Sequence, residues 1–244
     1  MIQIQNLKKS FGDNLVWENV SFDIHEGETI AIIGRSGCGK SVLVKHLNAL
    51  IYPDEGNVII DGKNIFELEY VELRKMRQRF GVLFQGSALF DSINTFENIA
   101  FPLRYFTKKE DEQIREEVMK ALQMVNLEDA AEKSIAELSG GMRRRIALAR
   151  ATILTPDYLI YDEPTSGLDP QTSDEINELI INLAKNMNIT SIVVTHDIHS
   201  VLEIAETVAF LDNKKLCWHG TVEEMRQSDN KLLRDFVTAS EYKI

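Results

Sequence analysis

Cysteine is scarce in this sequence, with only Cys38 and Cys217 among 244 residues. Two cysteines so far apart form no disulfide framework of the kind that stabilises small secreted domains. Cys38 has two interpretations: a small residue that its loop tolerates, or a redox-active thiol with a raised thiolate fraction. The first needs no special environment, and we adopt it.

Long hydrophobic runs are also missing. No stretch approaches the roughly 18 uncharged apolar residues of a transmembrane helix, and Met1 to Gln5 lack the charged and then apolar pattern of a signal peptide. We therefore expect the chain to stay in the cytosol. With no low-complexity tract, long linker or evident repeat, 244 residues at 44% hydrophobic content fit one α/β domain, with or without an inserted subdomain.

An excess of positive charge is absent too. The formal net charge is −11 and the pI is about 5.0, whereas bulk nucleic-acid binding requires a basic surface. We therefore expect no nucleic acid among the partners. The one dense basic run in the sequence is Arg143-Arg144-Arg145, which we interpret as a solvated helix face that forms ion pairs.

A glycine-rich segment points to a phosphate ligand. It reads Gly34-Arg35-Ser36-Gly37-Cys38-Gly39-Lys40-Ser41, the G-x-x-x-x-G-K-[S/T] pattern of a P-loop. Backbone N–H groups of such a loop cradle the β- and γ-phosphates, while Lys40 adds positive charge and Ser41 a hydroxyl for Mg²⁺. The alternative is a glycine-rich turn with a chance lysine. The strand expected at 28–33 and the helix expected at 41–50 favour the P-loop.

Hydrophobic periodicity predicts an α/β fold around this loop. Alternation over residues 16–24, broken at Glu18, and the Asp61-Gly62 turn signal predict an antiparallel layer beside the site. Residues 110–125 place apolar side chains on one helical face, and we interpret 85–150 as a mainly helical insertion. From residue 158 to 211, strands and helices alternate, which predicts a mainly parallel sheet with the ligand at the carboxyl ends of its strands.

Two further motifs carry polar groups suited to nucleotide chemistry. Asp162-Glu163 follows an apolar strand, where Asp162 could hold Mg²⁺ opposite Ser41 and Glu163 could act as a general base. An ordinary acidic pair after a strand is the alternative. Ser139-Gly140-Gly141 precedes an amphipathic helix and predicts a second anion site at the helix N-terminus. The alternative is a plain N-cap.

Together these motifs resemble the ATP-binding subunits of ABC transporters. The P-loop, Leu138-Ser139-Gly140-Gly141-Met142, Asp162-Glu163, Ser166-Gly167-Leu168-Asp169 and Thr195-His196-Asp197 occur in the family's order, and the likeness extends from Phe11 to about residue 225. The resemblance implies a P-loop NTPase core with an antiparallel β layer and a helical insertion. It also implies ATP hydrolysis with ATP and Mg²⁺ as cofactors, by a homodimer.

The resemblance assigns a role to each site residue. Phe11 stacks on adenine, with a core phenylalanine as the alternative, and Gln85 contacts Mg²⁺ and the attacking water. Ser41 and Asp162 complete the metal site. Glu163 is the base, and His196 and Lys40 stabilise charge on the γ-phosphate. The residues assigned to the dimer are Asp169, which signals across it, and Ser139, Gly140 and Gly141, which bind the nucleotide of the opposite subunit.

Val42 departs from the family pattern, which often has Thr or Ser there. The change removes one contact to the α-phosphate, worth about 1 kcal/mol. The implied division is a core of residues 1–84 and 151–224, a helical subdomain of residues 85–150 and a tail of residues 225–244.

The string at 87–92, Ser-Ala-Leu-Phe-Asp-Ser, and Met142 are similar to the Mla/Mce-type ATPases of phospholipid transport. This implies a membrane permease and an Mce-domain lipid-binding protein as partners, and a peripheral location on the cytoplasmic side of the inner membrane. We interpret Leu89, Phe90, Phe101 and Leu103 as a surface patch for a permease helix, with a buried loop core as the alternative.

Three other functions stay open at this stage. The first is the ATPase subunit of a polar amino-acid or other small-solute importer. The second is a soluble ABC-type ATPase that acts on DNA or ribosomes, although such proteins have long coiled-coil insertions or tandem cassettes that this chain lacks. The third is a phosphotransferase kinase, against which the Ser139-Gly140-Gly141 motif argues.

Overall fold

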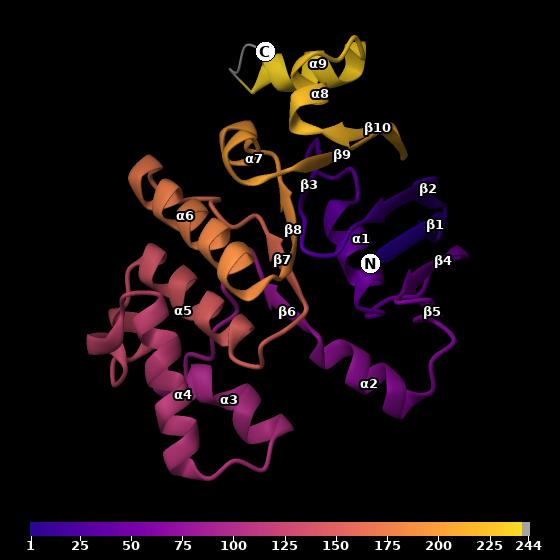
Figure 1. Ribbon diagram of the computed structural model, residues 1–244. Helices are drawn as coiled ribbons and strands as arrows, with labels where there is room; N and C mark the ends of the chain where they lie inside the picture. The colour runs from indigo at the N-terminus through magenta and orange to yellow at the C-terminus, as the bar shows by residue number, and fades with distance from the viewer. Residues whose placement is uncertain (241–244) are drawn as a thin grey trace.

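Six strands form the central sheet of the computed structural model, which describes residues 1–240 (Figure 1). Their order is β10-β9-β3-β8-β7-β6, and all neighbours are parallel except β9 and β10. The strands are β3 Thr29–Gly34, β6 Phe80–Leu83, β7 Tyr158–Asp162, β8 Thr190–Thr195, β9 Thr207–Asp212 and β10 Lys215–Thr221. The mainly parallel sheet predicted from the sequence is confirmed.

Alternate residues of these strands pack on opposite faces of the sheet. On one face, Leu159 and Tyr161 of β7 pack against Ile176 and Ile180 of α6 (Pro170–Met187). On the other face, Ile160 joins a core shared with the second sheet and with α1 (Lys40–Leu47). Because both faces are covered, the strands are continuous apolar runs, as buried parallel strands usually are.

The second sheet is antiparallel, in the order β2-β1-β4-β5. Its strands are β1 Ile2–Phe11, β2 Asn14–Ile24, β4 Glu55–Ile60 and β5 Lys63–Asn64. Asp61 and Gly62 both have positive φ, as a two-residue hairpin turn requires, so the predicted hairpin is confirmed. The break at Glu18 coincides with a register shift between β1 and β2. On the N-terminal side of this shift in β2, Trp17 rather than Val16 is fully buried.

Three helices form a separate layer at the lower left of Figure 1. They are α3 Thr95–Phe106, α4 Asp111–Met124 and α5 Gly140–Thr152, with short 3₁₀ helices at Glu128–Ala130 and Ile135–Glu137 between α4 and α5. Ile114, Val118 and Leu122 of α4 pack with Ile99 of α3 and Ile146 of α5 in a core of their own. Residues 85–150 are therefore mainly helical, as predicted, while the exact subdomain boundaries stay a prediction.

The remaining helices flank the two sheets. They are α2 Tyr70–Gln78, α7 Ile198–Ile204, α8 Val222–Arg226 and α9 Lys231–Ala239. The prediction that Leu50 belongs to the helix after the P-loop was wrong, because α1 ends at Leu47 and Leu50 is exposed. In the predicted tail, Leu233, Phe236 and Val237 of α9 pack against Phe210 of β9. Residues 241–244 of that tail lie outside the described residues.

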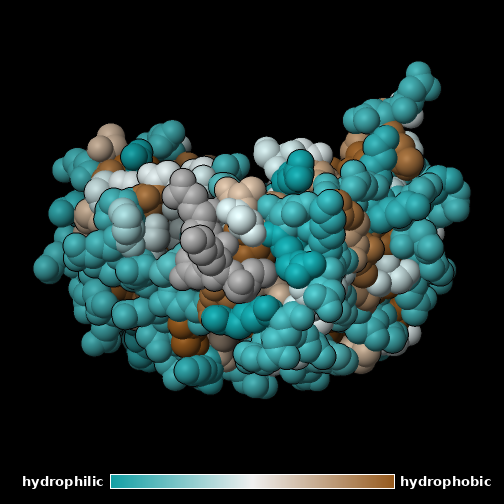
Figure 2. Space-filling model, turned by 90° about the horizontal axis from the view of Figure 1, so that it is seen from above, coloured by the Kyte–Doolittle hydropathy of each residue, from teal (hydrophilic) through white to brown (hydrophobic). Residues whose placement is uncertain are grey.

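Seen from above, the end of the molecule that carries α8 and α9 is largely hydrophilic, with apolar side chains only in small patches (Figure 2). Among residues 1–240, no helix combines the length and the apolar character that a membrane span requires. The prediction from the sequence agrees with this.

His46 gives α1 a measurable pH dependence. Its ring is fully buried beside Trp17, Nδ1 contacts the carbonyl of Val42 at 2.7 Å, and burial lowers the pKa of His46. Below pH 6.5 the unfolded chain takes up a proton that the folded chain resists, so stability is full above pH 6.5 and falls as the pH drops. We expect His46→Gln to flatten this fall, by at most about 1.4 kcal/mol per pH unit.

Denaturant unfolding between pH 5 and 8 measures this difference. His25→Gln is the matched control, because His25 is exposed. An equally steep loss of stability in the wild type and in His46→Gln would contradict the prediction.

Candidate functional site

A cavity of 910 Å³ opens at the carboxyl ends of the parallel strands. Gly34 ends β3, Asp162 ends β7 and Thr195 ends β8, and these three strands are neighbours in the sheet. The predicted residues that line the cavity are Phe11, Arg35, Ser36, Gly37, Gly39, Lys40, Ser41, Val42, Gln85, Glu163 and His196. Most of the predicted nucleotide site is therefore brought together by the fold.

At two glycines of the P-loop, Gly34 and Gly39, there is no room for a side chain. Gly39 has φ of 98°, and a Cβ there would collide with the indole of Trp17, whose Nε1 donates to the Gly39 carbonyl at 3.3 Å. The buried Lys40 ammonium lies inside the loop and donates to the carbonyls of Gly34 at 2.8 Å and Arg35 at 3.3 Å. A positive charge therefore lies where phosphate oxygens would bind.

Cys38 belongs to this loop but does not line the cavity, and its sulfur lies against Gly34. Burial raises the pKa of the Cys38 thiol, although the nearby Lys40 charge acts in the opposite direction. A raised pKa reduces the thiolate fraction, so the structure supports the small, tolerated residue rather than the redox-active thiol.

Ser41 of the cavity wall contacts Asp162, which lies next to Glu163 at the end of β7. The Ser41 hydroxyl donates to Oδ1 of Asp162 at 3.3 Å. Burial raises the pKa of Asp162, and the neighbouring Glu163 carboxylate adds to the effect. A divalent cation would offset both effects, because its positive charge stabilises the ionised carboxylate. Hydroxyl, carboxylate and amide oxygens are the ligands that Mg²⁺ prefers. Ser41, Asp162 and Gln85 therefore have the chemistry of an Mg²⁺ site.

Glu163 is held in a strained backbone position beside His196. Its φ is 52°, and its N–H donates to the Val194 carbonyl at 2.8 Å. Nδ1 of His196 lies 2.9 Å from the Glu163 carboxylate, which also accepts from the Thr195 hydroxyl at 3.3 Å. Left-handed backbone at a non-glycine residue is stabilised only where the surroundings fix it. The arrangement orients a carboxylate in the cavity, as a general base requires.

Phe11 lines the same cavity. Its exposure of 51% excludes the core alternative. The Lys9 ammonium lies 5.4 Å from the ring centroid, and Lys9 is itself paired with Asp54 at 2.8 Å. Part of this wall was not predicted from the sequence: Asn14, Val16, Phe236, Ala239 and Ser240 also line the cavity. Phe236 and Ala239 belong to α9 and Ser240 is its C-cap, and this helix is far from the P-loop in the sequence.

Seven predicted residues do not line this cavity: Gly34, Cys38 and Asp162, which adjoin residues that do, and four others that lie close to one another. Ser139 caps α5, with its hydroxyl accepting from Met142 N–H at 3.2 Å, and Asp169 caps α6, accepting from Thr172 N–H at 3.0 Å. A Cβ on Gly140 would touch Leu168, and a Cβ on Gly141 would collide with Thr172. The two helix starts therefore pack together, outside the nucleotide cavity of their own chain.

The family follows from this geometry and from one comparison. The model of the ABC transporter family matches residues 17–166, from strand β2 through the P-loop to Ser166. The chain belongs to the ABC transporter family. It is the ATP-binding subunit of such a transporter.

Curated relatives agree over nearly the whole chain. The probable ribonucleotide transport ATP-binding protein mkl of Mycobacterium leprae is 42% identical over 97% of this chain and 68% of its own length. The intermembrane phospholipid transport ATP-binding protein MlaF of Haemophilus influenzae is 40% identical over 97% of this chain and 90% of its length. The methionine import ATP-binding protein MetN of Clostridium tetani is 43% identical over 92% of this chain and 70% of its own length. The chain spans 66% of the mkl proteins of two other mycobacteria, Mycobacterium bovis and Mycobacterium tuberculosis.

Solved structures show the same architecture. The dimeric ATP-binding cassette MJ0796 bound to ADP and Pi is 31% identical, with a TM-score of 0.83 over 91% of this chain and 99% of that chain. The cbiO1 protein of Clostridium perfringens is 28% identical, with a TM-score of 0.84 over 98% of both chains. With the family and these neighbours, the chain is an ATPase.

A groove of 560 Å³ lies between α2, the loop after β6 and α3; we name it the aromatic groove. Its exposed rings are Tyr70, Phe84, Phe90, Phe101, Tyr105 and Phe106. The sequence prediction of a surface patch is confirmed for Phe90 and Phe101. It was wrong for Leu103, which is 1% exposed, and for Leu89, which packs with the helical core, because both point inward.

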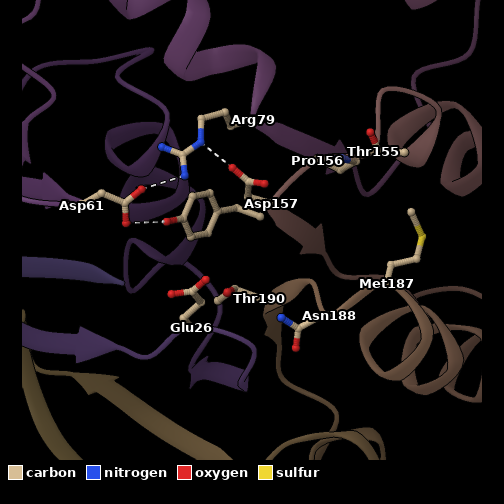
Figure 3. A pocket seen from close by; sticks show the side chains of 10 residues that line it. Glu26, Asp61, Arg79, Thr155, Pro156, Asp157, Met187, Asn188 and Thr190 are labelled. Atoms are coloured by element: carbon tan, nitrogen blue, oxygen red, sulfur yellow. Dashed lines mark hydrogen bonds and ion pairs between the residues drawn. The ribbon is translucent and has the colours of Figure 1, made fainter.

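A second cavity, of 390 Å³, lies at the opposite edge of the sheet, where β6, β7 and β8 begin (Figure 3). There the Arg79 guanidinium points to Asp61 at 2.7 Å and to Asp157. The Tyr158 hydroxyl donates to Asp61 at 3.3 Å. The charges and hydrogen-bonding groups in this cavity are therefore paired with one another, and they link the antiparallel sheet to the central sheet. We interpret this cavity as structural.

Proposed function

We propose that this ATPase drives phospholipid transport across the bacterial envelope. The observation that carries the proposal is the likeness to MlaF, which is 40% identical and of which the chain covers 90%. The Ser87–Ser92 string and Met142 support the same group. The likeness to MetN favours one alternative, import of a small polar solute.

The proposed unit is a homodimer. In this chain the P-loop lies at one site and Ser139, Gly140 and Gly141 lie at another, where a helix N-terminus offers N–H donors. Two copies facing each other would place this helix start against the γ-phosphate in the partner's P-loop. The dimeric MJ0796 structures, one with ADP and Pi, support this arrangement.

Each proposed composite site contains all the groups that hydrolysis requires. Glu163 orients and deprotonates water, and Lys40 and His196 stabilise the charge that develops on the γ-phosphate. Mg²⁺, held by Ser41, Asp162 and Gln85, would neutralise phosphate charge when bound. Asp169, at the start of α6, would transmit the state of one site to the other across the dimer.

The proposed permease contact is the aromatic groove. Arg74, Arg77 and Arg150 line it, and none of the described residues in its wall is acidic, on a protein whose net charge is −11. The Arg150 guanidinium lies 5.7 Å from the Phe90 ring, and Arg74 lies 5.6 Å from Tyr105. An amphipathic permease helix with apolar anchors and a carboxylate fits this surface, which would hold the ATPase on the cytoplasmic side of the inner membrane.

We expect Phe90→Asp to abolish permease binding while ATP affinity is unchanged. Phe90 is 44% exposed in the groove and does not line the nucleotide cavity. The change removes an apolar anchor and places a carboxylate beside Arg150, where it would compete with the proposed carboxylate of the permease helix. Co-purification with the permease from membranes and equilibrium ATP binding measure the two effects. Leu232→Asp, on the exposed face of α9, is the control. Retention of the permease by Phe90→Asp would exclude the groove.

Native-membrane purification tests the substrate. The ATPase is captured with its permease, the co-purified lipid and any Mce-domain protein are identified, and the complex is placed in vesicles. Phospholipid transfer that depends on ATP supports the proposal. Stimulation of hydrolysis by methionine or another small polar solute, without lipid transfer, would favour the importer.

A further inference from the structure

Arg144 lies on the buried side of α5, contrary to the sequence prediction of a solvated basic face. That prediction holds for the exposed Arg143 and for Arg145, which pairs with Glu175, but Arg144 is only 4% exposed. Its Nη1 donates to the carbonyls of Phe84 at 2.9 Å and Gln85 at 2.6 Å. Its Nη2 reaches the Ser166 carbonyl at 3.4 Å.

A buried cation in this position needs a physical reason. None of the described acidic side chains pairs with Arg144, Nε has no hydrogen-bond partner, and burial lowers the pKa of the guanidinium. Burial of an unpaired charge is unfavourable unless polar groups surround it. Here three backbone carbonyls serve that purpose. A residue needed only to fill space would be apolar. We therefore attribute the presence of the guanidinium to the hydrogen bonds by which it joins these separate backbone segments.

Those segments join the nucleotide cavity of this chain to the helix starts that lie outside it. Gln85 lines the nucleotide cavity, and Ser166 lies in the loop between Glu163 and Asp169. Arg144 itself lies one turn after the start of α5 at Gly140.

A second arginine of α5 holds the rest of the same loop. Arg150 donates to the carbonyls of Ser87 at 2.9 Å and Ala88 at 2.8 Å, and both of these residues have positive φ. The loop from Phe84 to Ala88 is thus attached to α5 by side chains.

We propose that Arg144 is a positioning residue that attaches the backbone of Gln85 to α5. The position of Gln85 in the nucleotide cavity then depends on the position of the helical subdomain. The inference rests on the proposed role of Gln85 at the attacking water. A guanidinium spans two loops with a planar set of donors, which a lysine ammonium cannot do. Arg144 therefore acts through Gln85 rather than on the nucleotide.

A double-mutant cycle tests this. In the wild type, we expect Arg144→Lys to lower kcat about tenfold, while the Kd for ATP stays within about twofold. In a Gln85→Ala background, the same substitution should lower kcat no further, because the residue through which it acts is gone. Arg145→Lys is the matched control, and its small effect should be the same in both backgrounds.

Arg144→Gln is the second variant, and thermal unfolding checks that each protein is folded. Its amide has two N–H donors, no charge and a shorter side chain than arginine, so it cannot span both loops, and its kcat should be as low as that of Arg144→Lys or lower. If Gln85→Ala hydrolyses ATP at the normal rate, both the role of Gln85 and the inference are wrong. If Gln85→Ala is slow but Arg144→Lys reduces kcat equally in both backgrounds, only the positioning by Arg144 is wrong.

Discussion

Glu163→Gln is expected to bind ATP normally and to hydrolyse it about a hundredfold to ten-thousandfold more slowly, the usual contribution of a general base. The glutamine keeps the size of the side chain and an oxygen that can accept from the Thr195 hydroxyl, now 3.3 Å away. It cannot take a proton from water. Release of phosphate and equilibrium ATP binding measure the two quantities.

The same variant should accumulate as an ATP-bound dimer, because the closed dimer can no longer hydrolyse the ATP that holds its two subunits together. Analytical ultracentrifugation with and without ATP detects this species. Glu178→Gln, on the exposed side of α6, is the control and should behave as the wild type. Near-normal hydrolysis by Glu163→Gln would exclude Glu163 as the base.

The parts of the site that could be predicted are those encoded locally. The P-loop pattern fixes its own backbone, because glycine is needed where Gly39 has φ of 98°. Asp169 before Pro170 predicts a helix start from two adjacent residues, and the structure has the cap at that position. In each case the signal and the structure span fewer than ten residues.

The parts that could not be predicted depend on packing between distant segments. Arg144 stands between two arginines on the same helix, and only the approach of the loop at Phe84 and Gln85 makes it buried. Ala239 and Ser240 line the nucleotide cavity because α9 returns to the sheet beside β9. Short elements were missed for another reason: β6 has four residues, too few to show a period.

Dimer dependence is the prediction that separates this chain from a self-sufficient ATPase. We expect Ser139→Asp to remain folded, because aspartate caps a helix as well as serine does. Its own ATP affinity should be unchanged, since Ser139 does not line the nucleotide cavity of its own chain. Hydrolysis should fall by at least about a hundredfold, the effect of losing a preorganised donor at the reacting phosphate, because the new carboxylate would face the partner's γ-phosphate.

The assay compares phosphate release per molecule over a wide range of protein concentration. The wild-type rate should rise with concentration as dimers form, and Ser139→Asp should stay slow throughout. Gln123→Glu adds the same charge on the exposed face of α4 and should leave the concentration dependence intact. The composite site would be refuted by Ser139→Asp that hydrolyses ATP at the full rate as a monomer, since a nucleotide bound to one P-loop would then need no second chain.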